Sequence, residues 1–260
     1  MPSISYDFHD STVLVTGGTQ GIGRAIAEAF ARAGANLAIC ARTQADLTAA
    51  VADLATLGTG DCRGFRADLA EPDAPQRLFR QVEDELAPLD LLINNAAAQG
   101  NFPFPDGMDR DTWTWMLQVN MTAPFELSRL LALSLAKRQA GGAIVNILSN
   151  QIIRHAKGRV GYGSTKLGLA GLTRSMALEL ATASLRVNAV APGFVEVPRM
   201  YRDFDDVDQR LAAMPLGRFV QPREIADVTL FLCSDAASAV TGVIVPVDGA
   251  HSLDGSWVRD

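Results

Sequence analysis

Tyr162 and Lys166 stand four residues apart in a segment whose apolar spacing predicts a helix. Four residues make about one helical turn, so the two side chains share a face and lie close together. A tyrosine with an ordinary pKa of about 10 needs a neighbouring cation to act as an acid or base near neutral pH, and the lysine supplies that charge. The pair indicates proton transfer, although a half-buried tyrosine beside a surface lysine has the same spacing.

Ser149 adds a polar group to this chemistry. It follows an apolar run, 143–148, which predicts a buried strand, so the serine lies at the carboxyl end of that strand. Open parallel sheets bind their ligands at that edge. The hydroxyl can hold a substrate carbonyl oxygen against Tyr162.

A glycine-rich turn supplies a second kind of site. Gly17, Gly21 and Gly23 lie between a β-branched and aliphatic run at 12–16 and a predicted amphipathic helix that ends at Gly34. Glycines allow the backbone to turn tightly and approach a pyrophosphate, and the helix N-terminus favours the anion. A purely structural loop has the same composition, but the position at the first strand-to-helix turn favours a dinucleotide site.

Short apolar runs and longer amphipathic segments alternate along the chain, which predicts an α/β fold with a doubly wound parallel sheet and helices on both faces. The expected strands are 12–16, 36–41, 61–67, 90–93, 143–148, 184–190 and 243–247. Further helices are expected at 44–57, 72–87, 110–119, 123–138, 161–183 and 222–233. The least regular stretches, 99–109 and 197–214, suit binding loops.

Composition limits the class of protein. The 260 residues are 48% hydrophobic and 20% charged, which favours one compact domain over 1–260. The net charge of −6, without a basic patch, argues against nucleic acid or an anionic membrane as a partner. No apolar run approaches the roughly 18 residues that span a bilayer, and the start does not resemble a signal peptide, so we expect a cytoplasmic protein. The three scattered cysteines indicate neither disulfides nor a metal site.

Taken together, these motifs resemble the short-chain dehydrogenase/reductases in their single-domain form. The resemblance is carried by Thr16-Gly17-x-x-x-Gly21-Ile22-Gly23, Asn94-Asn95-Ala96-Ala97, Pro192-Gly193 and the Tyr-x-x-x-Lys pair, with Ser149 thirteen residues before Tyr162. It implies a Rossmann-type sheet of about seven strands and an enzyme that transfers a hydride between a nicotinamide cofactor and a carbonyl or secondary alcohol. In place of the last glycine of Asn-Asn-Ala-Gly, this sequence has Ala97.

The resemblance also implies roles for single residues. The catalytic set is Asn120, Ser149, Tyr162 and Lys166, in which Tyr162 transfers the proton, Ser149 orients the oxygen, Lys166 lowers the tyrosine pKa and Asn120 keeps a proton relay open. The cofactor set is Gly17, Thr19, Gln20, Gly21, Ile22, Gly23, Arg42, Asp68, Leu69, Asn95, Ala96, Tyr162, Lys166, Pro192, Gly193 and Val195. Val197 stands where relatives usually place a threonine that helps to hold the nicotinamide carboxamide.

The end of the second strand bears on the choice of cofactor. An acidic residue there would bind the ribose 2′-hydroxyl of NAD(H), whereas an arginine pairs with the 2′-phosphate of NADP(H). Ala41 replaces the acid and Arg42 follows it, so NADP(H) is favoured over NAD(H). Gln20 weakens this inference because many NADP-using relatives have a second basic residue at that position.

Three loops should shape the pocket for a mid-sized, partly apolar small molecule: 99–109, 150–160 and 195–214. The expected substrate contacts are Ser149, Gln151, His155, Tyr162, Phe102 and Met200. An NAD-dependent sugar or polyol dehydrogenase and a non-catalytic cofactor-binding module remain alternatives. A sugar-nucleotide epimerase is disfavoured by the glycine spacing.

The predicted helix 161–183 is apolar on two faces, so either its own domain or a second subunit must bury it. The corresponding helix in the family packs between subunits, which implies a homotetramer or a homodimer. Residues 251–260, with Trp257, either close a neighbouring subunit's pocket or form a loosely packed terminus.

Overall fold

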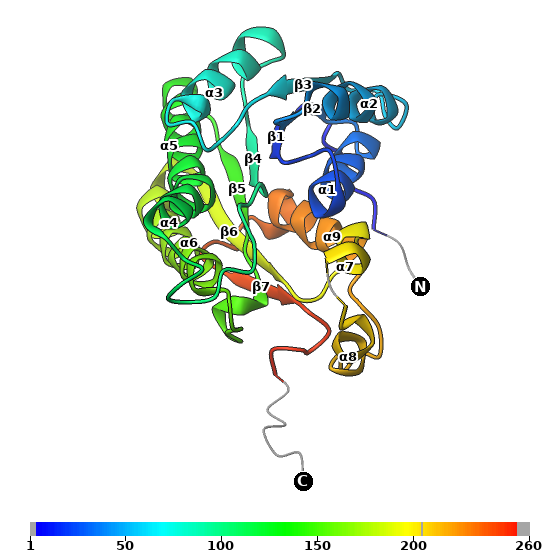
Figure 1. The fold of residues 1–260 in the computed structure, drawn as a ribbon. Helices are drawn as coiled ribbons and strands as arrows, with labels where there is room; N and C mark the ends of the chain where they lie inside the picture. The colour runs from blue at the N-terminus through cyan, green and yellow to red at the C-terminus, as the bar shows by residue number, and fades with distance from the viewer. Residues whose placement is uncertain (1–3, 204, 254–260) are drawn as a thin grey trace.

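A computed structural model describes residues 4–203 and 205–253 of the chain. One parallel sheet of seven strands, in the order β3-β2-β1-β4-β5-β6-β7, runs through it (Figure 1). The strands are β1 (Thr12–Thr16), β2 (Asn36–Ala41), β3 (Cys62–Arg66), β4 (Leu91–Asn94), β5 (Gly142–Ile147), β6 (Leu185–Pro192) and β7 (Ile244–Val247). The order reverses between β1 and β4, and ligands of doubly wound sheets bind in the crevice that such a reversal opens.

Helices cover both faces of the sheet (Figure 1). They are α1 (Gly21–Arg32), α2 (Gln44–Leu54), α3 (Ala74–Glu85), α4 (Arg110–Leu117), α5 (Ala123–Arg138), α6 (Val160–Leu180), α7 (Pro198–Asp203), α8 (Val207–Ala212) and α9 (Pro222–Cys233). In β1, Val13 and Val15 join the core formed with α1, α2 and α9, while Leu14 joins the core formed with α3 and α5. Both faces of the strand are buried, which explains its continuous apolar sequence.

The predicted doubly wound α/β fold is confirmed. β1, β2, α5 and α9 have the predicted bounds, and the other five strands differ by one or two residues at their ends. Gly34, with a φ of +85°, takes the left-handed conformation expected just after α1. Within the described residues, no helix has both the length and the apolar composition needed to cross a membrane.

One expectation about the connections was wrong, and another connection has a form that the sequence did not predict. The stretch 197–214, expected to be irregular, forms the short helices α7 and α8. The helices expected at 110–119 and 123–138 are joined without a break by a π-helical turn, Gln118–Thr122. Pro124 lies in the first turn of α5 and cannot donate a backbone hydrogen bond, which accounts for an irregular turn before it. The turn carries Asn120, one of the predicted catalytic residues.

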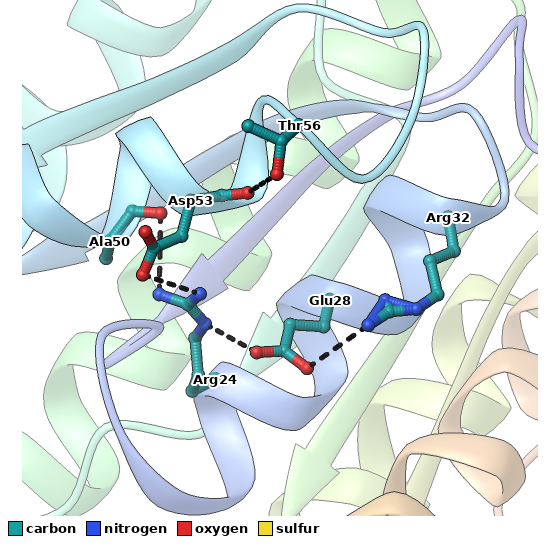
Figure 2. A network of polar contacts seen from close by, with 6 residues as sticks. All are labelled: Arg24, Glu28, Arg32, Ala50, Asp53 and Thr56. Carbon is teal, nitrogen blue, oxygen red and sulfur yellow. Dashed lines mark hydrogen bonds and ion pairs between the residues drawn. The ribbon is translucent and has the colours of Figure 1, made fainter.

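A polar network joins α1 to α2 beside the glycine turn (Figure 2). Arg24 Nε donates to Glu28 Oε1 at 2.8 Å within α1, and Arg24 Nη2 pairs with Asp53 Oδ2 of α2 at 3.3 Å. Arg24 Nη1 also donates to the carbonyl oxygen of Ala50, while Glu28 pairs with Arg32 one turn further along. The network therefore helps to fix the direction in which the N-terminus of α1 points.

Candidate active site

The glycine turn has the geometry of an anion site. Gly17 and Gly21 have φ angles of +67° and +58°, which side-chain-bearing residues rarely adopt. A Cβ at Gly23 would overlap the carbonyl oxygen of Gly17 and the side-chain amide of Asn95, so only glycine allows this approach. In the described structure, no side chain caps the N-terminus of α1 and its first turn has no acidic residue. The turn therefore fits the pyrophosphate of a dinucleotide.

Hydrogen bonds hold this turn against the end of β4. Thr16 Oγ1 donates to the carbonyl oxygen of Ile93 at 3.2 Å and accepts from the backbone N–H groups of Asn95 and Ala96 at 2.9 and 3.0 Å. Asn95 Nδ2 donates to the carbonyl oxygens of Thr16 and Gly17 at 2.8 and 3.2 Å. The predicted cofactor residues Gly17, Asn95 and Ala96 thus meet where the strand order reverses.

Two arginines lie at the carboxyl ends of β2 and β3. Ala41 pairs in register with Arg66, and Arg66 Nε donates to the carbonyl oxygen of Arg42 at 3.2 Å. Both arginines are exposed. Arg42 was predicted from the sequence and Arg66 was not, because Arg66 is brought to this place only by the pairing of β2 with β3.

The other predicted cofactor residues are placed as follows. Thr19 and Gln20 lie in the glycine turn and Ile22 in the first turn of α1. Asp68 follows β3, and its Oδ1 accepts from the N–H of Ala70 at 3.0 Å, which shapes the turn. Leu69 is buried in the core that includes α3 and α5.

The segment after β6 reaches the glycine turn. β6 ends at Pro192, Gly193 follows, and Val195 is buried. A Cβ built on Gly21 would lie 3.6 Å from Val197 Cγ1. The segment after β6 therefore brings Val197 next to the predicted pyrophosphate site.

Tyr162 and Lys166 project from the first turns of α6, with Lys166 Nζ 5.8 Å from the centre of the Tyr162 ring. The lysine is only 2% exposed, and its Nζ donates to the carbonyl oxygen of Ile147 at the end of β5, at 2.6 Å. Burial lowers the pKa of Lys166 to about 8. The side chain therefore still carries its charge at neutral pH.

Three groups counteract the effect of burial on the pKa of Tyr162. Burial raises the pKa of its hydroxyl, whereas a hydrogen bond with Ser149 lowers that pKa, as do the charges of Arg159 and Arg199. Ser149 caps a short 3-10 turn, and its Oγ accepts from the N–H of Gln151 at 3.3 Å. The predicted serine and tyrosine therefore face each other, and the two arginines are groups that the sequence analysis missed.

Asn120 is buried and connects α6 to the loop after β4. Its Oδ1 accepts from the N–H of Ala98 at 2.7 Å, and its Nδ2 donates to the Ala98 carbonyl oxygen and to Thr165 Oγ1, both at 2.9 Å. Thr165 Oγ1 in turn donates to the carbonyl oxygen of Tyr162 at 2.9 Å. Asn120 therefore acts on the position of Tyr162 through Thr165, a residue within the Tyr-x-x-x-Lys motif that the sequence analysis did not single out.

The two loops before α6 pack against each other near the tyrosine. The N–H of Phe102 donates to the carbonyl oxygen of Gly158 at 2.8 Å, and Arg159 Nη1 donates to the carbonyl oxygen of Gly100 at 2.9 Å. Phe102 belongs to the same apolar cluster as Tyr162.

The remaining predicted substrate residues, Gln151, His155 and Met200, lie in different surroundings. Gln151 Oε1 and His155 Nδ1 would lie 3.7 and 3.9 Å from a Cβ at Gly163, the residue after Tyr162. Gln151 Oε1 is buried and accepts no hydrogen bond within the described part of the chain, so it is available to accept one from a ligand. Met200 is 6% exposed and packs in the core with Val195, so its side chain is largely covered by the chain itself.

An anion-binding turn and a charged lysine beside a tyrosine, at the carboxyl edge of a doubly wound sheet, define a dinucleotide-dependent oxidoreductase. A family model described as Enoyl-(Acyl carrier protein) reductase matches residues 17–251. The chain belongs to the short-chain dehydrogenase/reductase family, whose members use nicotinamide cofactors.

Several relatives are similar over most of their length. The chain is 37% identical to the 3-oxoacyl-acyl-carrier-protein reductase FabG of Aquifex aeolicus, covering 91% of this chain and 95% of the relative. It is 38% identical to the L-xylulose reductase of Bos taurus, covering 91% and 94%. A solved structure from Beutenbergia cavernae, described as an NAD(P)-dependent gluconate 5-dehydrogenase with NADP at low occupancy, matches with a TM-score of 0.88 and 31% identity, covering 95% and 99%.

Proposed function

We propose that this protein is an NADP(H)-dependent oxidoreductase that acts on the carbonyl or secondary alcohol of a small molecule. The observation that carries the proposal is the arrangement around Tyr162: the buried Lys166 has its Nζ 5.8 Å from the centre of the Tyr162 ring, and Ser149 is close enough to lower the pKa of the Tyr162 hydroxyl. The non-catalytic alternative would not need these three groups together.

The chain's own residues then have separate roles in the reduction of a carbonyl. The bound nicotinamide supplies the hydride. Ser149 holds the substrate oxygen, and Tyr162 donates a proton to that oxygen as it gains negative charge. Lys166 stabilises the phenolate that remains, and Asn120, through Thr165, keeps α6 in position. Oxidation of an alcohol reverses these steps.

Arg42 and Arg66 support NADP(H) over NAD(H). Both arginines are exposed, Arg42 just after β2 and Arg66 at the end of the neighbouring β3, beside the position where the adenosine ribose binds in this class of sheet. A 2′-phosphate there would gain charge-assisted hydrogen bonds, and Ala41 offers no carboxylate to bind a 2′-hydroxyl.

The test is a titration of intrinsic tryptophan fluorescence with NADPH and NADH. We expect wild type to bind NADPH more tightly, and Arg42→Ala and Arg66→Ala each to weaken NADPH binding about 10-fold or more while leaving NADH unchanged. Arg80→Ala, an exposed arginine on α3, is the matched control. Equal affinity for both cofactors in wild type would refute the NADP(H) preference. It would favour the alternative hypothesis of an NAD-dependent sugar or polyol dehydrogenase.

A sugar or polyol is a second candidate substrate class, favoured by the similarity to an L-xylulose reductase and to a structure described as a gluconate 5-dehydrogenase. A substrate screen should therefore pair ketoses with simple ketones of equal carbon number. Consumption of NADPH with the ketoses alone would favour the hypothesis that the substrate is a sugar.

For the assembly, we propose a homotetramer or homodimer that contacts through α6. Leu167 and Leu178 on this helix are 50% and 82% exposed in the single chain, so the chain itself leaves part of the apolar helix uncovered. Light scattering at working concentration tests this, since a monomeric mass would refute it.

A further inference from the structure

The segment after β7 folds back onto its own chain. The N–H of His251 donates to the carbonyl oxygen of Asp248 at 3.1 Å, and the N–H of Ser252 donates to Asp248 Oδ2 at 2.8 Å. This turn buries His251, which is 6% exposed. Of the tail expected either to close a neighbouring subunit's pocket or to pack loosely, His251 therefore packs against its own chain, Leu253 is 82% exposed, and Trp257 lies outside the described residues.

His251 joins the two segments that flank the candidate site. Its Nδ1 lies 2.8 Å from Asn150 Nδ2, and its carbonyl oxygen accepts from Arg154 Nη1 at 2.7 Å. Its ring lies 4.7 Å from that of Phe194, which follows Pro192 and Gly193. One side chain thus contacts both the segment after Ser149 and the segment after β6.

The contact with Asn150 is sensitive to loss of the acceptor. With Asn150 Nδ2 as donor, His251 Nδ1 is the acceptor, so the ring proton lies on Nε2. Asn150 is 8% exposed, and a buried amide donor without a partner is costly enough to shift the turn that contains it. Asn150 begins the 3-10 turn that Ser149 caps, so such a shift would move the serine hydroxyl.

We propose that His251 is a positioning residue: through Asn150 it holds the Ser149 hydroxyl in place against Tyr162. The importance of the Ser149 hydroxyl for catalysis rests on the proposed function. The effect of His251 on the position of that hydroxyl can be measured without a substrate.

The ionisation of Tyr162 reports on the position of Ser149, because the hydrogen bond with Ser149 lowers the pKa of Tyr162. The other charged groups that act on Tyr162 are Lys166, Arg159 and Arg199. The proposed variants leave all three unchanged.

Nor do the variants change the charged groups that the described residues place near His251. Arg154 donates to the His251 carbonyl oxygen, Asp248 accepts from the turn, and the guanidinium of Arg210 lies 5.0 Å from the centre of the neighbouring Phe194 ring.

The primary experiment follows phenolate absorbance in the near ultraviolet as the pH is raised. The chain has three tyrosines, and the spectrum of Tyr162→Phe, subtracted from each profile, isolates Tyr162. His251→Phe keeps an aromatic ring against Phe194 but removes the acceptor. We expect it to raise the midpoint by about half a pH unit, towards the value for Ser149→Ala. His251→Asn offers an amide oxygen near the position of Nδ1 and should restore much of the shift.

His9→Phe is the matched control, because His9 lies near the N-terminus with its side chain 60% exposed. If His251→Phe lowers the melting temperature but leaves the Tyr162 midpoint where wild type and His9→Phe have it, His251 is only structural and the inference is refuted.

A second readout uses any carbonyl that wild type reduces. His251→Phe should lower kcat about 3- to 10-fold with NADPH affinity unchanged, and an unchanged kcat would also refute the inference. A shifted Tyr162 midpoint in an enzyme that reduces no carbonyl would refute the proposed function and leave the positioning role standing.

Discussion

The side of the molecule that we propose binds the cofactor is built from backbone, whereas the side that we propose binds the substrate is built from side chains on loops. Gly17, Gly21 and Gly23 shape the first by conformations and approaches that a Cβ would prevent. Phe102 and Gln151 line the second from segments without regular strands. A backbone site tolerates few residues, so it leaves a strong sequence pattern, and a loop site does not.

The variant with the largest expected effect should lose activity and keep its affinity for the cofactor. Tyr162→Phe removes the proton donor but keeps the ring, so we expect kcat to fall about 10³-fold. Fluorescence titration should show NADPH affinity within about 2-fold of wild type. A variant that keeps a tenth of the wild-type kcat would show that another group transfers the proton.

The glycine turn should respond in the opposite way. In Gly23→Ala the new methyl group overlaps the Gly17 carbonyl oxygen and the Asn95 amide, so we expect NADPH affinity to fall about 100-fold and stability by about 1–3 kcal/mol. Gly171→Ala on α6 is the matched control, because a Cβ there meets nothing within 4 Å. It should be neutral or stabilising by up to about 1 kcal/mol. Equal cofactor affinity in the two variants would contradict the proposed backbone site.

Lys166 lies where the two sides meet, and the burial of its charge destabilises the folded protein. Its pKa is about 8 in the folded protein and about 10.5 when unfolded, so between these values the unfolded chain binds more protons. The free energy of unfolding therefore rises with pH through this window as the penalty is relieved. Lys166→Met should stabilise the protein at pH 7 by about 2 kcal/mol, lose that advantage near pH 10, and abolish activity. Denaturant unfolding at both pH values measures this, and a destabilised variant at pH 7 would contradict it.

The same contrast explains what the sequence could predict. The bounds of β1 and β2 were predicted to the residue, because buried strands restrict residue type, and the glycine turn lies between β1 and α1 as expected. The Tyr162–Lys166 pair was found because helical spacing alone brings the two residues together.

Other site residues had no local signal. Arg66 depends on the pairing of two strands, and Arg199 and His251 depend on how α7 and the segment after β7 return to the site. Contacts of this kind link residues far apart in sequence, so composition and periodicity do not report them.

The smallest expected effect lies where the two sides meet. A Cβ on Gly21 would lie 3.6 Å from Val197 Cγ1, and the family resemblance implies a threonine at the position of Val197. Val197→Thr keeps the shape of the side chain and adds a hydroxyl, which we expect to bond the nicotinamide carboxamide and tighten NADPH binding about 2- to 5-fold. Val51→Thr, a half-buried valine on α2, controls for the hydroxyl alone. Tighter binding in Val197→Thr only would place the nicotinamide against 193–197, and unchanged binding in both would argue that the carboxamide lies elsewhere.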